Sequence, residues 1–213
     1  PALVQFINTL GSNSQVSIYS NSSLLHSNLV YNDATEFLEV FPYSNIYISG
    51  PDGNNIYHFK SNFVSTEKYK CVFSGQGSDD YPYTESINQP VDVSDGDLSI
   101  NFLNCIYDEH SIDITLLDID QLASGLPLGD FTEYFNFGAS YLPSSVSFGV
   151  QRHSDESLIE TFLVPIGDFE SESISLIFSG YFDYSSDQQP VYLLGVNESG
   201  DVSVWGELLN NTP

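Results

Sequence analysis

Three carboxylates around a glycine near the middle of the chain are the residues best suited to bind a metal ion. Asp92, Asp95 and Asp97 lie around Gly96, and two further acids precede them at positions 79–80. Clustered carboxylate oxygens are the ligands that Ca²⁺ prefers in proteins. The EF-hand pattern is absent, so we expect no cofactor unless calcium binds here. The alternative is a polar hinge without metal.

Catalytic groups are sparse. None of the four histidines stands in an H-x-H, H-E-x-x-H or Cys/His zinc spacing. The chain has no G-x-S-x-G elbow and no glycine-rich phosphate loop. His110 with Asp113 and a serine would imitate a hydrolytic triad, but such trios arise easily in a serine-rich chain. The sequence therefore predicts that the protein is not an enzyme.

Aromatic side chains offer another kind of binding chemistry. The segment Tyr81-Pro-Tyr83 follows Gly75, and Tyr181-Phe-x-Tyr184 follows Gly180 in or near an equivalent loop. Exposed rings on rigid loops suit stacking on sugars or contact with another protein. In the alternative interpretation these rings fold back over the rim of the domain.

Two cysteines are too few for a disulfide framework. One interpretation joins Cys71 to Cys105 in a single bridge between the two halves of the chain. The other makes Cys71 a small buried hydrophobe, because it shares the alternation of Tyr69 and Phe73.

The charge balance excludes several partners. There are 29 acidic residues against four basic ones, giving a net charge of −25. Such a charge repels phosphate backbones and anionic lipids, so we expect no nucleic-acid binding. No apolar run approaches the roughly 18–20 residues that span a bilayer, so we expect no membrane insertion. The acids form a solvated surface, or they bind counter-ions where acidic faces meet.

Three glycosylation acceptors indicate the protein's location. They begin at Asn21, Asn197 and Asn210. The chain also starts at Pro1, contains no methionine and has few lysines, which is typical of a mature product. These features favour an extracellular or cell-surface glycoprotein.

The elements that position these residues occur twice. Three segments return in the same order with a slowly growing offset: 3–8 as 99–104, 31–37 as 128–134, and 72–75 as 177–180. A period near 100 residues indicates tandem domains with loop insertions. We predict a first domain at 1–96 and a second at 97–213.

Period-two alternation of Val, Ile, Tyr and Phe dominates both copies. Besides the strands at the start of each copy, we expect strands at 36–41, 44–49, 55–60, 68–74, 132–138, 145–152, 157–163, 173–179, 190–195 and 201–205. Residues 90–93 are a candidate last strand of the first copy, and 118–124 a short helical turn. Segment 200–205 either closes the second domain or pairs with another subunit. The fold class is all-β, with two tandem antiparallel β-sandwiches of Ig-like or Greek-key type.

The repeated segments together resemble the DUF4397 family. That family follows a first strand with a Val-Asp-Val-Tyr strand, a Gly-Asp-x-Thr-x-Tyr segment and a closing strand ending in glycine. Here the second copy carries Ile112-Asp-Ile-Thr115, Gly129-Asp-Phe-Thr-Glu-Tyr134 and Ile177-Phe-Ser-Gly180. The first copy departs by carrying Asn32 where the family has glycine. The resemblance implies secreted or cell-surface sandwich domains without a defined activity.

The acids and threonines of the repeated Asp-x-Thr segment have a structural explanation. Asp33 and Asp130 precede a strand, where a carboxylate accepts backbone N–H groups and holds a turn, and Thr35 and Thr132 support it.

The leading functional hypothesis is an extracellular structural subunit that self-associates into a homopolymer, as a surface filament or layer. It follows from the repetition, the lack of chemistry and the alternating terminal segments. The alternative is an adhesion or carbohydrate-binding module that uses the tyrosine-rich loops to bind glycans. A hydrolase is the third hypothesis.

Overall fold

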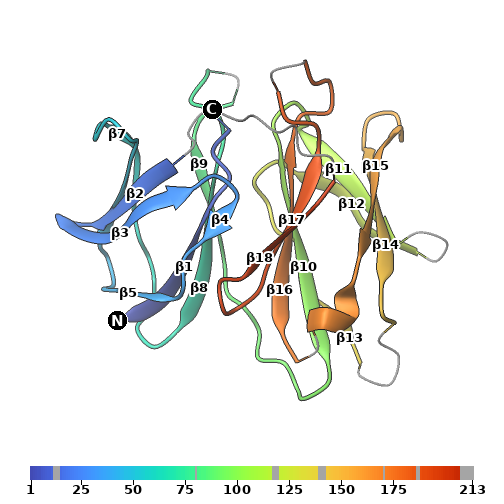
Figure 1. Ribbon diagram of the computed structural model, residues 1–213, viewed down its shortest axis with the longest axis horizontal. Coiled ribbons are helices and arrows are strands. Elements are labelled where there is room, and N and C mark those ends of the chain that lie inside the picture. Colours follow the sequence, from blue (N-terminus) through green and yellow to red (C-terminus); the bar gives the residue numbers. More distant parts are fainter. Residues whose placement is uncertain are drawn as a thin grey trace. The chain divides into compact units, whose positions relative to one another are not determined.

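The computed structural model describes residues 1–11, 15–79, 81–116, 120–138, 143–169, 171–185 and 188–206. Figure 1 shows that the regular secondary structure of these residues is almost all strand. The chain divides into two compact units: unit 1 comprises Pro1–Pro90 with Glu198–Val202, and unit 2 comprises Val91–Asn197 with Ser203–Pro213. The predicted all-β fold class is confirmed. The division falls at Pro90, whereas the sequence placed it at residue 96.

Unit 1 contains two sheets. One has the order β4-β1-β8-β9, with β5 also paired to β1, and the other has the order β3-β2-β6-β7. The strands are β1 Ala2–Asn8, β2 Gln15–Ser20, β3 Ser23–Val30, β4 Asp33–Ala34, β5 Leu38–Val40, β6 Asn45–Ser49, β7 Asn55–Lys60, β8 Lys68–Ser74 and β9 Thr84–Asn88.

Unit 2 repeats this plan. One sheet has the order β13-β10-β16-β17-β18 and the other β12-β11-β14-β15. The elements are β10 Leu98–Ile106, β11 Ser111–Leu116, β12 Asp120–Pro127, β13 Phe135–Phe137, β14 Val146–Arg152, β15 Leu158–Val164, the 3₁₀ helix η2 Ile166–Phe169, β16 Ser173–Gly180, β17 Tyr192–Val196 and β18 Val202–Trp205. No helix in the described part of the chain is long and apolar enough to cross a membrane.

One strand pair in each unit is parallel, whereas the sequence predicted purely antiparallel sandwiches. β1 pairs parallel with β8, and β10 pairs parallel with β16. The strands of the other sheet come between the two members of each pair in the sequence. The chain therefore returns by a long connection, and no tight hairpin forces the pair to be antiparallel.

Each unit has its own apolar core, and the same ring cluster lies in both. Phe6 stacks on Phe73 at 5.7 Å between ring centroids, and Phe102 stacks on Phe178 at 6.0 Å, both at 11° between ring planes. All four side chains are fully buried. The alternation seen in the repeated segments thus places equivalent rings between the two sheets of each unit.

All ten predicted later strands form, with ends shifted by up to three residues. Four strands were not predicted: β3, β4, β9 and β12. The helical turn expected at 118–124 is wrong from residue 120 onward, because β12 pairs with β11 there. Residues 118–119 lie outside the described residues. The strand expected at 90–93 is also wrong, since β9 closes the sheet of unit 1. Segment 200–205 had two possible roles, and it forms β18, which closes the sheet of unit 2.

The predicted turn threonines act as substitutes for a backbone partner. Thr35 Oγ1 accepts the N–H of Phe6 at 3.0 Å, and Thr132 Oγ1 accepts that of Phe102 at 3.0 Å. Asp33 Oδ1 accepts the N–H of Ala34 at 2.9 Å, whereas Asp130 joins its turn through its backbone, donating to Pro127 O at 3.2 Å. Each threonine hydroxyl thus accepts a backbone N–H of β1 or β10 in place of a carbonyl oxygen of a neighbouring strand.

Positive φ angles explain why asparagine can replace glycine in the first copy. Asn32 has φ 60° and its equivalent, Gly129, has φ 82°. Asparagine tolerates this left-handed region better than other residues with a side chain. The departure from the DUF4397 pattern at this position leaves the turn unchanged.

A buried asparagine joins the two sheets of each unit, and sequence reasoning assigned it no role. Asn8 Nδ2 donates to Leu29 O at 3.1 Å, and Asn104 Nδ2 donates to Leu126 O at 3.1 Å. Their Oδ1 atoms accept the N–H of Leu10 at 3.1 Å and of Ile106 at 3.0 Å. The available signal was an asparagine at the end of both copies of the first repeated segment.

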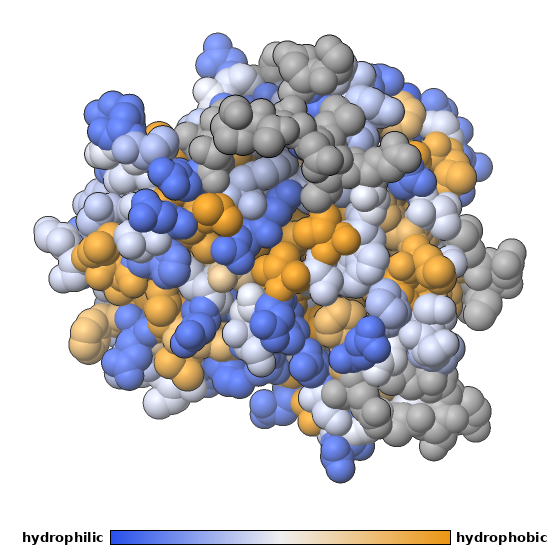
Figure 2. All heavy atoms as spheres, in the orientation of Figure 1, coloured by the Kyte–Doolittle hydropathy of each residue, from blue (hydrophilic) through white to orange (hydrophobic). Residues whose placement is uncertain are grey.

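Figure 2 shows one face of the molecule coloured by residue hydropathy. Exposed hydrophobic residues among the described ones lie there in several separate groups between polar residues. Scattered exposed hydrophobic residues of this kind are normal on a globular protein.

Candidate functional site

The aromatic loop after β16 is the best-defined candidate site, and it begins at a constrained glycine. Gly180 has φ +106°, and a Cβ placed on it would lie 2.3 Å from the carbonyl oxygen of Pro190. Tyr181 N–H donates to Gln189 O at 2.9 Å on the same side of the loop. Only glycine lets the two ends of the loop approach this closely.

A carboxylate then holds the next two residues of the loop. The two oxygens of Asp108 accept the N–H groups of Phe182 and Asp183, each at 2.7 Å. Charge-assisted hydrogen bonds of this kind are roughly twice as strong as neutral ones. The acidic run after β10 therefore anchors the loop.

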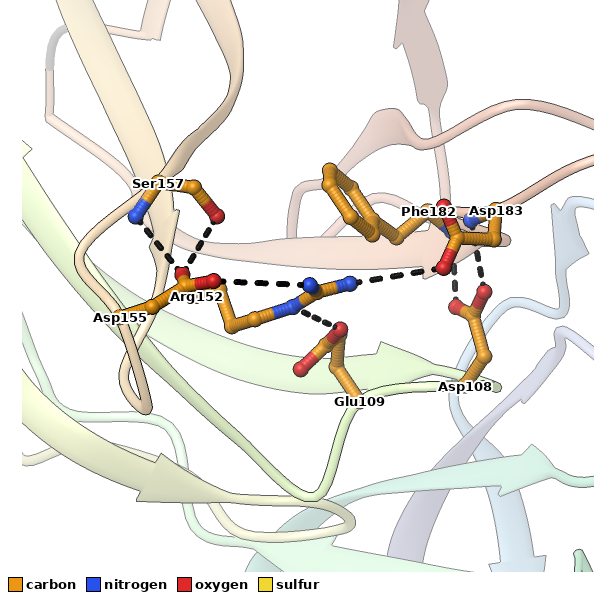
Figure 3. A network of polar contacts seen from close by, with 7 residues as sticks. All are labelled: Asp108, Glu109, Arg152, Asp155, Ser157, Phe182 and Asp183. Carbon is orange, nitrogen blue, oxygen red and sulfur yellow. Dashed lines mark hydrogen bonds and ion pairs between the residues drawn. The ribbon is translucent and has the colours of Figure 1, made fainter.

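Arg152, the only arginine in the chain, fixes the Phe182 ring (Figure 3). Its guanidinium carbon lies 3.9 Å from the ring centroid, which is a cation–π contact. Its Nε atom donates to buried Glu109 at 2.5 Å, and its outer nitrogens lie 3.8 Å from Asp155 and 3.6 Å from Asp183. The arginine thus ties β14 to the loop, and three carboxylates surround it.

The loop and strand β15 enclose a cleft of about 110 Å³. Three of the residues that line it are the aromatic residues of the loop, and Tyr184 is 54% exposed. The remaining contacts come from β15 and from the residues before β17. The complete lining is Ile159, Glu160, Tyr181, Phe182, Tyr184, Pro190 and Val191. The cleft therefore offers ring faces together with one carboxylate acceptor.

The equivalent loop of unit 1 is built in the same way but presents its rings differently. Gly75 has φ +102°, and a Cβ on it would lie 2.2 Å from the carbonyl oxygen of Pro82. Tyr83 packs against the core of unit 1 and lies under Gly77. Tyr83 therefore folds back over the rim of unit 1, as one interpretation of the aromatic loops held, whereas Tyr184 of unit 2 is exposed to solvent. Pro82 is therefore the counterpart of Pro190.

A histidine–aspartate pair forms elsewhere in unit 2, with a histidine that the sequence did not indicate. His153 Nδ1 lies 2.7 Å from Oδ1 of Asp113, whereas His110 is exposed. Burial by itself would raise the pKa of Asp113, but hydrogen bonds from Gly125 N–H, His153 and Ser124 lower it below its usual value. A hydrogen-bonded carboxylate of this kind orients the imidazole. The histidine beside Asp113 is therefore His153, whereas the trio considered from the sequence used His110.

The predicted calcium site is not assembled. Asp95 accepts the hydroxyl of Ser171 at 3.2 Å, and the backbone oxygen of Asp97 accepts the N–H of Ser171 at 2.7 Å. Across the described ranges, no group of three or more His, Cys, Asp or Glu side chains could hold a metal ion. Asp95 and Asp97 instead lie at a turn that Ser171 binds, because the segment folds against the chain before β16, and Asp92 precedes this turn.

The disulfide alternative is wrong, because both cysteines are buried free thiols. Cys71 lies within the core of unit 1, and burial strongly raises the pKa of its thiol. Cys105 lies on β10 in unit 2. Cys71 therefore has the other role considered for it, that of a small buried hydrophobe.

The glycosylation acceptors differ in their surroundings. Asn21 lies in an exposed turn at φ 54°. Asn197 is only 6% exposed, and its Nδ2 donates to Glu172 at 3.5 Å, so the folded chain does not present it for glycosylation. Asn210 lies outside the described residues. The prediction at Asn197 is corrected, since tertiary packing covers an acceptor that the tripeptide pattern cannot judge.

Comparison with known proteins shows little likeness. No protein-family model and no curated protein matches the chain. A streptococcal virulence factor described for alpha-glucan binding is 10% identical with a TM-score of 0.27, and the match covers 87% of this chain and 95% of that one. The CBM26 module of Eubacterium rectale Amy13K, solved with maltoheptaose, is 12% identical with a TM-score of 0.27 and covers 98% of each chain. Neither likeness places the chain in a family or assigns it a ligand, and the DUF4397 resemblance stays a prediction.

Proposed function

We propose that unit 2 is a carbohydrate-binding module whose cleft receives a neutral sugar. The observation that carries this proposal is the exposed Tyr184 ring beside Phe182, on a loop anchored at both ends. Aromatic faces pack against the apolar C–H face of a sugar ring, and the rim of the cleft offers polar groups to its hydroxyls.

Charge selects the kind of sugar. Glu160 lies in the cleft, Asp183 and Asp155 lie nearby around Arg152, and the whole chain carries a net charge of −25. Anionic ligands such as uronates or sulfated glycans are repelled by this field. A carboxylate is also a good acceptor for sugar hydroxyls. The proposal is therefore for neutral glycans, with a structural or adhesive role and no catalysis.

Replacing Tyr184 with alanine tests the cleft. We expect affinity for a neutral glycan to fall about tenfold, corresponding to roughly 1.4 kcal/mol, while Tyr184→Phe keeps most of it because the ring face remains. Binding is measured by native gel electrophoresis through soluble α-1,4-glucan, β-1,4-glucan and β-1,4-mannan. Tyr43→Ala is the matched control, since Tyr43 is 69% exposed but lies in unit 1. Equal retardation of the Tyr184→Ala variant and the wild type in all three gels would rule out the cleft.

A second candidate function is the self-association that the sequence favoured, and the edge strand β15 supports it. β15 ends its sheet in the order β12-β11-β14-β15, and no strand of the described residues covers its outer side. Leu158 and Leu163 on it are 55% and 62% exposed. An apolar, uncovered edge can pair with a strand of another copy.

Substituting Leu163 with lysine tests this second candidate, because a charge on an edge strand blocks pairing. If copies pair through β15, the wild-type sedimentation coefficient rises with protein concentration and that of Leu163→Lys does not. A wild-type coefficient that is independent of concentration would refute pairing in solution. An extracellular or cell-surface location fits both candidates and stays a proposal.

A further inference from the structure

The outer face of one sheet in unit 1 carries a row of rings that crosses its strands. Register pairs Tyr19 on β2 with Tyr47 on β6, and Tyr47 with His58 on β7. On the other side Tyr19 pairs with Leu24 of β3, which is 55% exposed. The row therefore runs perpendicular to the strands, one side chain for each strand.

The rings of Tyr47 and His58 lie nearly parallel to each other. Tyr47 and His58 stack at 5.9 Å between ring centroids with 19° between their planes. Their neighbours along each strand, Ile46, Ile48 and Phe59, are buried in the core, so strand alternation turns the ring row outward. His58 is exposed and both tyrosines are partly exposed. The row is thus an outward-facing set of three rings, of which Tyr47 and His58 are stacked on each other.

The internal repeat shows that the fold does not require these rings. In unit 2, Thr115 pairs with Gly149 and Gly149 pairs with Thr161, and these positions correspond to Tyr19, Tyr47 and His58. The buried partners of the two rows correspond too: Ile48 pairs with Ile18, and Val150 with Ile114. The same sheet therefore forms with small residues, so the rings need an explanation other than folding.

Polar side chains flank the ring row on both sides. Ser17 and Ser49 pair with each other on one side, and Asn45 and Lys60 on the other. Ser17, Asn45 and Lys60 lie on the same outward face as the rings, two residues away along their strands, whereas Ser49 is only 8% exposed. A ligand that stacks on the rings can hydrogen-bond to Ser17 along one edge and to Asn45 and Lys60 along the other.

We propose that this outward face, defined by Tyr19, Tyr47 and His58, is a second carbohydrate site that binds an extended neutral glycan chain. Stacking on ring faces tolerates a repeating ligand, because each sugar unit presents a similar C–H face to the next ring. Neighbouring strands lie about 4.8 Å apart, so a linear chain across the strands contacts successive rings. A net charge of −25 repels anionic chains, and the flanking Ser17 and Asn45 suit hydroxyls. This inference does not depend on the cleft.

The histidine ring gives a direct measurement. The chain has only four histidines, and His110 and His153 in unit 2 serve as internal references. Maltohexaose, cellohexaose and mannohexaose are titrated separately into the full chain, and the imidazole C–H resonances are followed by NMR. We expect at least one sugar to shift the His58 resonance in a saturable manner. Any shift of the His110 and His153 resonances would report binding in unit 2 alone.

Variants that copy unit 2 test the residues without disturbing the sheet. Tyr19→Thr, Tyr47→Thr and His58→Thr introduce threonine, which suits strands and already occupies two of the equivalent positions. We expect the double variant Tyr19→Thr/Tyr47→Thr to lower the affinity measured from the His58 shift at least tenfold. Tyr184→Ala should leave that affinity unchanged, so a failure of the cleft proposal and a failure of this one are distinguishable.

Three results would overturn the proposal. The first is a His58 signal that responds to none of the three sugars. The second is a double threonine variant that binds as the wild type does. The third is a His58 signal that changes with protein concentration in the absence of sugar, which would assign the ring row to contact between copies. As a control, a circular dichroism spectrum equal to that of the wild type shows that the sheet of each variant is intact.

Discussion

Gly180→Ala is expected to abolish glycan binding at the cleft and to destabilise unit 2 severely. The new Cβ would lie 2.3 Å from the carbonyl oxygen of Pro190, far inside van der Waals contact. Pro190 lines the cleft, so the backbone shift that relieves the clash moves one wall of the site. Clash and positive φ together cost roughly 3–5 kcal/mol. The measurements are glycan affinity by gel retardation and unfolding by calorimetry.

Two glycine controls separate the causes. Gly75→Ala meets the carbonyl oxygen of Pro82 at 2.2 Å in unit 1, so it should destabilise unit 1 and leave cleft affinity unchanged. Gly53 has φ +78° but nothing within 4 Å of its Cβ, so Gly53→Ala reports backbone strain alone, roughly 1–2 kcal/mol. A Gly180→Ala protein with wild-type affinity and melting temperature would show that the two ends of the loop separate freely.

Asn104→Ala is expected to lower the free energy of unfolding of unit 2 by roughly 3–4 kcal/mol. The side chain is fully buried and joins β10 of one sheet to β12 of the other through Leu126 O. Its removal leaves that carbonyl and the N–H of Ile106 without their partner, and it leaves a cavity. Urea unfolding followed by Trp205 fluorescence measures the effect, because Trp205 is the only tryptophan and lies in β18.

The matched variant is Asn8→Ala, whose side chain makes the same two kinds of hydrogen bond within 0.1 Å of the same lengths. We expect it to destabilise unit 1 by a similar amount while the Trp205 transition stays in place. Asn104→Asp distinguishes the two contacts, since it keeps an acceptor for Ile106 but loses the donor to Leu126. A loss below about 1 kcal/mol for Asn104→Ala would mean that water replaces the side chain at little cost.

The sequence by itself determined most of the strands and the doubling of the unit. Alternating apolar residues bury one face of a strand, and this period of two is a local property that can be read without a partner. It located ten later strands and the threonine turns at Thr35 and Thr132. It also explained Asn32, because tolerance of a positive φ belongs to the residue itself.

Local patterns failed where pairing decided the outcome. Residues 120–124 look like a helical turn but form a strand because β11 supplies hydrogen-bond partners. The tripeptide at Asn197 gives no sign that packing buries its amide. Asp95 and Asp97 both contact the distant Ser171, and Asp113 pairs with His153 although His110 is nearer in sequence.

Only the tertiary structure brought the candidate sites together. Arg152, Glu109 and Phe182 come from three distant segments, and Tyr19, Tyr47 and His58 from three strands. A strand's own sequence states which residues share its face, but not which residues of the next strand lie opposite them. Register is set by turns, bulges and the fit of the whole core, so the rows of side chains that bind a ligand are decided only when the sheets assemble.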